Sequence, residues 1–199
     1  MNTGTLVVIF LRLAVPPVIL RHPLGGLIAC MVLDTFDVAL VEILGGDSFG
    51  GATISYHSLD KFLDTYYLGF AAVVSQRWTD PLLRRTSFVL FFHRAIGVAL
   101  FEATGWRTLL LLFPNIFEYF FLFVVLTAGP LRRFRIQTVP HLAIVLLVVG
   151  IPQLAREYVF HRLGMTLVEQ INAFTPWNIE EPTVWEWLQV MFHRVVGSS

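Results

Sequence analysis

The sequence predicts an all-α fold, a polytopic membrane bundle of six transmembrane helices with a short first helix and a C-terminal amphipathic helix. Three observations support this prediction. Hydrophobic residues make up 56% of the 199 residues and mean hydropathy is +0.70. Only 14% of the residues are charged, against about a quarter in soluble domains. The apolar residues also form long segments without strand-like alternation, and only helices satisfy so much backbone in lipid.

The first apolar segment is the least regular. At fifteen residues, Leu6–Leu20 is shorter than the about 20 residues that a membrane span needs. It also contains Arg12 and the pair Pro16-Pro17. We therefore expect it to be tilted, kinked or only partly inserted.

Five further segments have the length and composition of membrane spans. In chain order they are Leu24–Leu44, a segment from Leu59 to just before Arg77, Thr86–Thr104, Leu109–Ala128 and Val139–Phe160. Together with the first segment they predict a bundle over residues 1–172.

The tail, residues 173–199, has a different pattern. From Thr183 to Val196, apolar residues such as Leu188 and Met191 recur at helical spacing, with Trp185 beside them. Tryptophan suits a membrane interface, where it buries its ring and keeps its N–H hydrated. This pattern predicts a helix on the bilayer surface, and the alternative is a helix packed on a partner subunit.

Arginines in short loops predict the orientation. Gln76–Arg85 and Gly129–Thr138 hold three arginines each and Arg21 lies in the first connection, whereas Gly45–His57 holds none. Basic loops stay in the cytoplasm. We therefore expect both termini outside the cell, with the protein in the plasma (inner) membrane. If the first segment does not cross, the N-terminus lies inside.

Composition also limits the partners. The formal net charge is zero and no basic tail is present, so nucleic acid is not expected. Cys30 is the single cysteine, which excludes an internal disulfide and a thiolate metal site. The expected partners are membrane lipid and either further copies of the chain or a larger membrane complex.

Two pairs of aspartates lie within predicted spans. Asp34 and Asp37 are three residues apart on the second span, and Asp60 and Asp64 are four apart on the third. Such spacings place each pair on one helix face. Because exposure of that face to lipid is costly, both faces should turn inward and bring the four carboxylates together. They are the candidate metal-ligating or cation-binding residues.

Other polar residues are expected at the same depth. The candidates that surround the four aspartates and complete the binding site are Lys61, Arg94, Glu102, Asn115 and Glu118. Given the predicted orientation, this convergence indicates a hydrated cavity that opens outward. Acids outnumber bases in it, so it should favour a cation or a proton.

The aspartate spacing resembles a known family. Asp34-Thr-Phe-Asp37 followed by Asp60 and Asp64 is similar to the DxxD…DxxxD pattern of CDP-alcohol phosphatidyltransferases. The resemblance implies a six-span enzyme in which the four aspartates hold a divalent cation around a diphosphate and one acts as base. Val38 stands where that family has glycine, and Val41 and Glu42 stand where it has Ala-Arg.

Three functions remain open. The first is binding of a cation or proton for transport, because intramembrane acids often mark ion pathways. The second is a divalent-metal-dependent enzyme acting on a lipid phosphate. The third is a structural or accessory subunit, in which the charges only neutralise one another as buried pairs.

Overall fold

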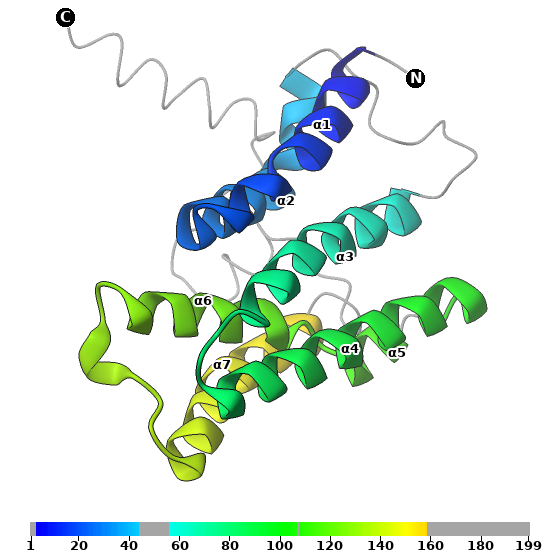
Figure 1. Cartoon of the computed structure of the whole chain (residues 1–199). Coiled ribbons are helices and arrows are strands. Elements are labelled where there is room, and N and C mark those ends of the chain that lie inside the picture. The colour runs from blue at the N-terminus through cyan, green and yellow to red at the C-terminus, as the bar shows by residue number, and fades with distance from the viewer. Residues whose placement is uncertain (1–2, 44–55, 107, 159–199) are drawn as a thin grey trace, which may run out of the picture.

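The computed structural model describes residues 3–43, 56–106 and 108–158, and this part of the chain is helical without strands (Figure 1). Its helices, in chain order, are α1 (Thr3–Ala14), the 3-10 helix η1 (Pro16–Leu20), α2 (Pro23–Ile43), α3 (Tyr56–Ser75), α4 (Pro81–Thr104), α5 (Thr108–Leu112), α6 (Ile116–Ala128), the 3-10 helix η2 (Arg132–Phe134) and α7 (Val139–Tyr158). The expected interfacial helix of the tail and most of the expected external loop lie outside the described residues.

The N-terminal segment is short and broken. The helix α1 has 12 residues, which at 1.5 Å per residue is about 18 Å, less than the roughly 30 Å of a bilayer core. It ends before Pro16, because a proline lacks the N–H that would continue the helix. The next residues form η1, which packs on α2 and α3.

The fourth helix begins five residues earlier than the apolar pattern predicts. The Oδ1 of Asp80 accepts hydrogen bonds from the backbone N–H groups of Leu82 and Leu83, at 2.9 and 3.4 Å. Pro81 occupies the first helical position, where no N–H is needed. Gly105 ends the helix with a φ of 71°, which glycine adopts at low cost.

The fifth predicted span is interrupted at Pro114. Two helices replace it, α5 and α6; Pro114 has no N–H for the helical hydrogen-bond ladder, and its ring crowds the preceding turn. The break exposes backbone carbonyls inside the bundle, and that of Phe113 becomes part of the candidate site.

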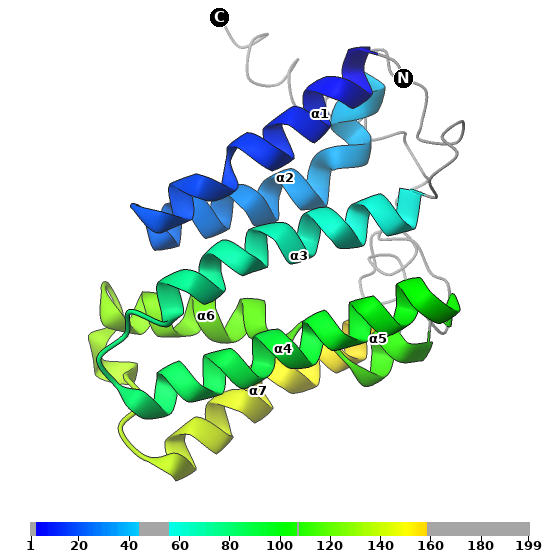
Figure 2. The same ribbon diagram turned by 45° about the vertical axis from the view of Figure 1, so that its right-hand side comes forward.

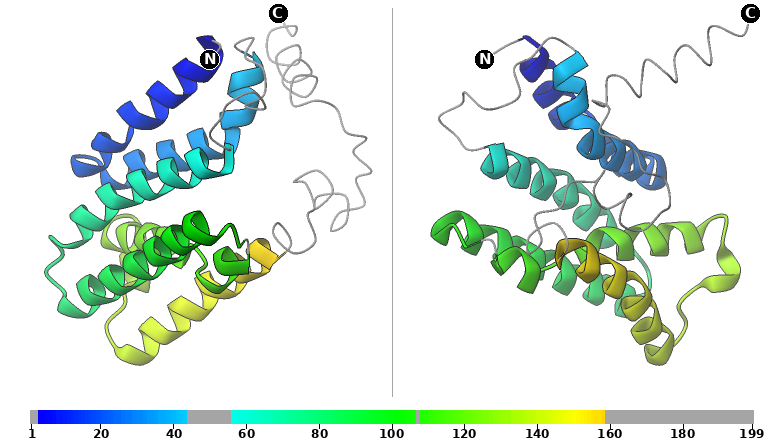
Figure 3. Two further views of the ribbon diagram at one scale, coloured as in Figure 1. Left: turned by 90° about the vertical axis from the view of Figure 1, so that its right-hand side faces the viewer. Right: turned by 180° about the vertical axis from the view of Figure 1, so that it is seen from behind.

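The long helices lie side by side and run between two opposite ends of the molecule. Figures 1 and 2 show α1 and α2 on one side of α3, and α4, α6 and α7 on the other. Figure 3 shows the same arrangement from two further directions. The turns from α3 to α4 and from α6 to α7 lie at the same end, which we call the arginine end. The core between the groups contains Phe117, Phe120 and Phe121, all fully buried.

Within the described ranges, two stretches are long and apolar enough to cross a membrane, Pro81–Thr104 and Thr108–Ala128, the second including the break at Pro114. Thr5–Leu20 and Val139–Ala155 are apolar but shorter. The all-helical class is thus confirmed for the described residues.

Candidate functional site

The four aspartates lie at one depth of the bundle. Asp34 and Asp37 follow the first residue of α2 by 11 and 14 positions. Asp64 and Asp60 precede the last residue of α3 by 11 and 15 positions. These helices are antiparallel neighbours, and α2 begins and α3 ends at the arginine end, so nearly equal spacings give similar heights.

A single guanidinium group contacts all four carboxylates. Nη1 of Arg12 donates to Asp37 at 2.6 Å and to Asp60 at 2.9 Å. Nη2 donates to Asp64 at 2.8 Å and also to Asp34. The guanidinium fork can do this because it presents several N–H groups in one plane. Arg12 therefore joins α1, α2 and α3 at one point.

Lys61 is the second cation of this group. Its Nζ contacts Asp60 at 2.8 Å and Asp64 at 3.2 Å, which are the two partners that its position on the same helix predicts. We refer to Arg12, Lys61 and the four aspartates as the Arg12 cluster.

The Arg12 cluster is buried and has more acids than bases. Arg12, Asp37 and Asp64 are 6%, 3% and 7% exposed, and the other members are partly buried. Among the described residues of the cluster, four carboxylates face two cationic side chains, which is a formal excess of two negative charges. An uncompensated charge in a low-dielectric interior is costly, so the charge balance of the cluster is the feature that bears on its function.

The cavity beside the Arg12 cluster is small. It measures about 10 Å³ and is lined by Arg12, Asp37 and Asp60 together with apolar side chains of α1 and α3. This volume holds about one water molecule. In the described conformation the cluster is thus closed by ion pairs, and this cavity is smaller than the hydrated cavity that the sequence suggests.

A second polar group surrounds Glu118. The hydroxyl of Tyr67 donates to Glu118 Oε1 at 2.6 Å, and Nδ2 of Asn115 donates to Oε2 at 2.8 Å. Tyr67 follows Asp64 by three positions on α3, so it lies on the same helix face as the Arg12 cluster. The Oδ1 of Asn115 is buried without a hydrogen-bond partner among the described residues, which leaves an acceptor available beside an acid.

Arg94 binds the break between α5 and α6. Its Nη1 donates to the carbonyl oxygen of Phe113 at 2.9 Å, which is a group freed by Pro114. Gly97 permits this approach, because a Cβ there would stand 2.1 Å from Cβ of Phe113. The break at the proline therefore leaves a carbonyl acceptor inside the bundle, and Arg94 donates a hydrogen bond to it.

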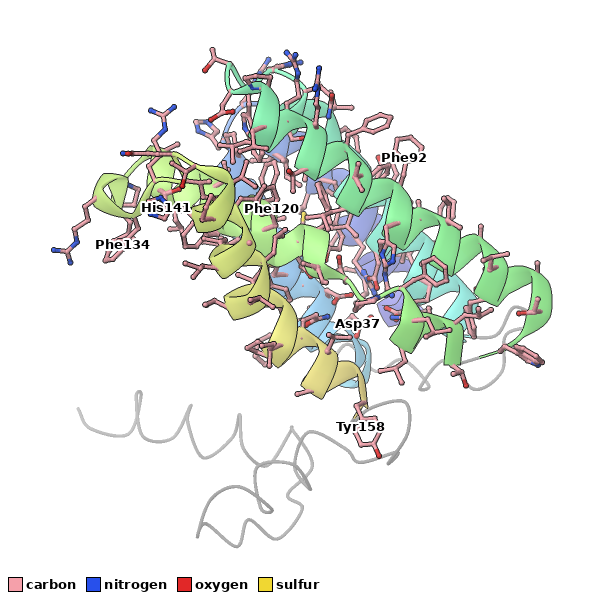
Figure 4. All side chains as sticks on the ribbon, turned by 90° about the horizontal axis from the view of Figure 1, so that it is seen from below. Asp37, Phe92, Phe120, Phe134, His141 and Tyr158 are labelled. Atoms are coloured by element: carbon pink, nitrogen blue, oxygen red, sulfur yellow. The ribbon has the colours of Figure 1, made fainter. Side chains whose placement is uncertain are left out.

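Glu102 is not part of either group. It follows Arg94 by eight positions, about 12 Å along the helix, and its side chain is exposed near the end of α4. Figure 4 shows the depth of the Arg12 cluster: Asp37 lies inside the bundle, away from the arginine end, which carries Phe134 and His141. Of the residues expected around the aspartates, Lys61 contacts them, while Arg94, Asn115 and Glu118 form neighbouring contacts.

Arg12 and Tyr67 are the site residues that sequence reasoning missed. A signal for Arg12 was available, because this arginine lies in an apolar segment without an acid one helical turn away. Its counter-charge therefore had to come from other helices, and the nearest acids in the sequence are on α2. Tyr67 gave no comparable signal, since a tyrosine in an apolar helix is ordinary.

Three of the carboxylates converge as metal ligands do. Oxygens of Asp34, Asp60 and Asp64 all lie within 4.8 Å of one another, and divalent cations such as Mg²⁺ prefer carboxylate oxygens. However, Arg12 donates to each of these three side chains. A divalent ion and the guanidinium would compete for the same oxygens, so these residues do not fit a metal while Arg12 remains in place.

Comparisons with known proteins give no assignment. The chain matches no protein-family model, and comparison with curated proteins and with solved structures finds no match either. The likeness to CDP-alcohol phosphatidyltransferases therefore rests on the spacing of four aspartates alone.

Proposed function

We propose that this chain is a six-span integral membrane protein whose Arg12 cluster binds a cation, in the simplest case a proton, and that this binding serves transport. The observation that supports the proposal is the charge balance of the cluster, in which, among the described residues, four carboxylates on two helices face two cationic side chains. Intramembrane acids commonly mark ion and proton pathways.

The distribution of side chains supports the membrane placement. On α7, Ile144, Leu147, Val148 and Ile151 are each more than half exposed and recur at the spacing of one helix face. Large apolar side chains also cover the outer face of α4, while Arg94 and Glu118 are buried. Apolar residues outside and charged residues inside suit a bilayer as solvent better than water.

Protonation would act through Arg12. A proton on Asp34 or Asp60 removes one of the carboxylates that hold the guanidinium and weakens the contact between α1 and the helices α2 and α3. Loss of the proton restores that contact. Because α1 is short and ends at a proline pair, it is the element best suited to move as the cluster changes charge.

A flux assay tests the transport proposal. The protein is reconstituted into sealed liposomes with a trapped pH-sensitive dye, and a membrane potential is imposed with potassium and valinomycin. We expect proton entry faster than in protein-free vesicles, and entry at the background rate for the double variant Asp34→Asn with Asp60→Asn. The control is Glu102→Gln, which removes an exposed acid from α4 and should keep the parent rate.

Sodium and potassium gradients are tested in the same vesicles, with dyes selective for each ion. Flux of one of these ions that the double variant abolishes would support the proposal with that ion in place of the proton. Flux equal to that of empty vesicles for every ion would contradict transport.

A structural role is the second candidate, and the small cavity favours it. Ion pairs that close on one another hold α1, α2 and α3 together without any ligand. In that case the parent and the double variant differ in thermal stability but not in response to cations or pH. A metal-dependent lipid-phosphate enzyme has less support, because it requires Arg12 to leave the carboxylates.

A further inference from the structure

A larger cavity lies at the arginine end. It measures about 440 Å³, within the range of about 300–1,000 Å³ that small-molecule sites occupy. It is bounded by the turn from α3 to α4, the first turn of α4, the last turns of α6 and the segment after η2. No member of the Arg12 cluster is among the residues that line this cavity, so it is a separate site.

The cavity has an apolar floor and a polar rim. Leu83 of α4 and Val124 of α6 are buried beneath it, while Thr79 and Arg135 are exposed at its edge. A ligand that fits this lining carries an apolar part and a polar part. A free inorganic anion would leave the apolar floor without a partner.

The walls of the cavity are fixed by packing. Trp78 stacks on Phe121, with ring centroids 5.4 Å apart. Ile136, next to Arg135, is 2% exposed and packs in the cluster that contains Leu83 and Val124. Burial of Ile136 therefore holds Arg135 at the rim.

The segments around the cavity are basic, while its own lining holds one acid, Asp80, and one base, Arg135. The segments 76–85 and 129–138 together contain six arginines and a single acid, Asp80. Asp80 uses its carboxylate to cap α4, whereas Arg135 has no ion pair or hydrogen bond within the part of the chain that the structure describes. A guanidinium group binds phosphate well because its N–H groups match the phosphate oxygens.

We propose that this cavity binds the phosphate headgroup of an anionic phospholipid, with Arg135 on the phosphate and the first part of an acyl chain over Leu83 and Val124. The inference rests on the membrane placement in the proposed function, which sets the arginine end at the level of lipid headgroups. Basic pockets between helices on the cytoplasmic side of membrane proteins suit such headgroups.

Native mass spectrometry of the detergent-solubilised protein, titrated with phosphatidylglycerol, tests this proposal. We expect one tight site in the parent, about tenfold weaker binding in Arg135→Gln, and unchanged binding in the matched control Arg133→Gln. Arg133 lies in the same loop and is exposed over the ring of Phe134, 4.9 Å from its centroid, but it does not line the cavity. Ala128→Trp, which fills the cavity without a change of charge, should also abolish the tight site.

Three results would overturn the proposal. Equal loss in Arg133→Gln and Arg135→Gln would mean general attraction to a basic surface. Binding of glycerol phosphate as tight as that of the lipid would mean that the apolar floor has no role. Binding of zwitterionic phosphatidylcholine as tight as that of phosphatidylglycerol would mean that the net charge of the headgroup has no role.

The double variant Asp34→Asn with Asp60→Asn separates this proposal from the proposed function. It should bind phosphatidylglycerol as the parent does, whatever becomes of its ion flux. Loss of lipid binding in this variant would mean that the cavity depends on the Arg12 cluster, and would contradict the inference of a separate site.

Discussion

At the scale of single residues, Arg12 is the side chain on which the site depends. A buried guanidinium is costly to dehydrate, and contacts with four carboxylates offset that cost. Removal of the cation leaves the acids of two helices facing each other across a low-dielectric gap. Their repulsion is the reason to expect a large effect from one substitution in a short helix.

We predict that Arg12→Ala destabilises the protein by about 3–5 kcal/mol, the range for breaking a buried ion pair. Arg12→Lys should cost less, because an ammonium group keeps the charge but cannot serve four carboxylates as the fork does. Thermal melting in detergent measures both. The control is Arg21→Ala, an exposed arginine on the same segment of chain. Equal melting temperatures for Arg12→Ala and Arg21→Ala would show that the contacts of Arg12 contribute nothing.

At the scale of elements, the close packing of η1 on α2 places Arg12 beside the aspartates. This packing requires Gly26, because a Cβ there would stand 2.6 Å from the backbone nitrogen of Ile19 and 2.8 Å from its Cα. The neighbouring Gly25 faces open space, and a Cβ added there would meet nothing within 4 Å. Of these two adjacent glycines, only Gly26 is therefore required for the packing of η1 on α2.

We predict that Gly26→Ala lowers stability by about 1–3 kcal/mol, the cost of overpacking, since backbone atoms cannot rotate away. Gly25→Ala should instead leave stability unchanged or raise it by up to about 1 kcal/mol, as alanine favours the helix. Paired melting curves in one detergent compare the two. A tolerated Gly26→Ala would mean that η1 does not pack on α2 as described.

The helices differ in how far the sequence predicts them. The pattern of apolar residues predicts α2, α3 and α7 to within a few residues, since each is a long apolar stretch without strand-like alternation. It places the start of α4 too late, because Asp80 and Pro81 extend the helix into polar sequence. It does not predict the break at Pro114 as two helices, because many membrane helices continue through a proline and only packing decides.

The site is predictable in part for the same reason. Spacings within a helix place Asp34 with Asp37 and Lys61 with Asp60 and Asp64. The convergence of the two aspartate pairs is expected from the cost that exposure of acids to lipid would carry. The role of Arg12 depends on contacts with residues on other helices that are 22 or more positions away in the chain. The periodicity within one segment carries no information about such contacts. Glu102 shares the expected helix face, but its height places it too far away.

At the scale of the whole molecule, the two ends of the bundle differ in charge. The turns from α3 to α4 and from α6 to α7 hold the six arginines, and the Arg12 cluster lies towards the other end. In the membrane placement proposed above, the exposed apolar side chains between the ends would leave only two orientations. The arginines favour the one in which their end faces the cytoplasm.

We predict that cysteines at Gln76 and Thr138 are protected from an impermeant thiol reagent in intact cells, and that a cysteine at Thr104 reacts. All three positions are exposed in the structure, and a Cys30→Ser background removes the native thiol. Permeabilised cells provide the control for accessibility. Reaction at Gln76 and Thr138 with protection at Thr104 would reverse the orientation and place the Arg12 cluster towards the cytoplasm.

Uptake of positive charge by the Arg12 cluster is tested most directly by infrared spectroscopy of its carboxyl groups in the reconstituted protein. The double variant Asp34→Asn with Asp60→Asn leaves two carboxylates against Arg12 and Lys61, so its cluster is formally balanced. We predict that varying pH or added cations shifts carboxyl bands in the parent and in Glu102→Gln, and that these shifts are absent from the balanced variant. Carboxyl bands that respond identically in all three proteins would contradict a cation or proton site in the cluster.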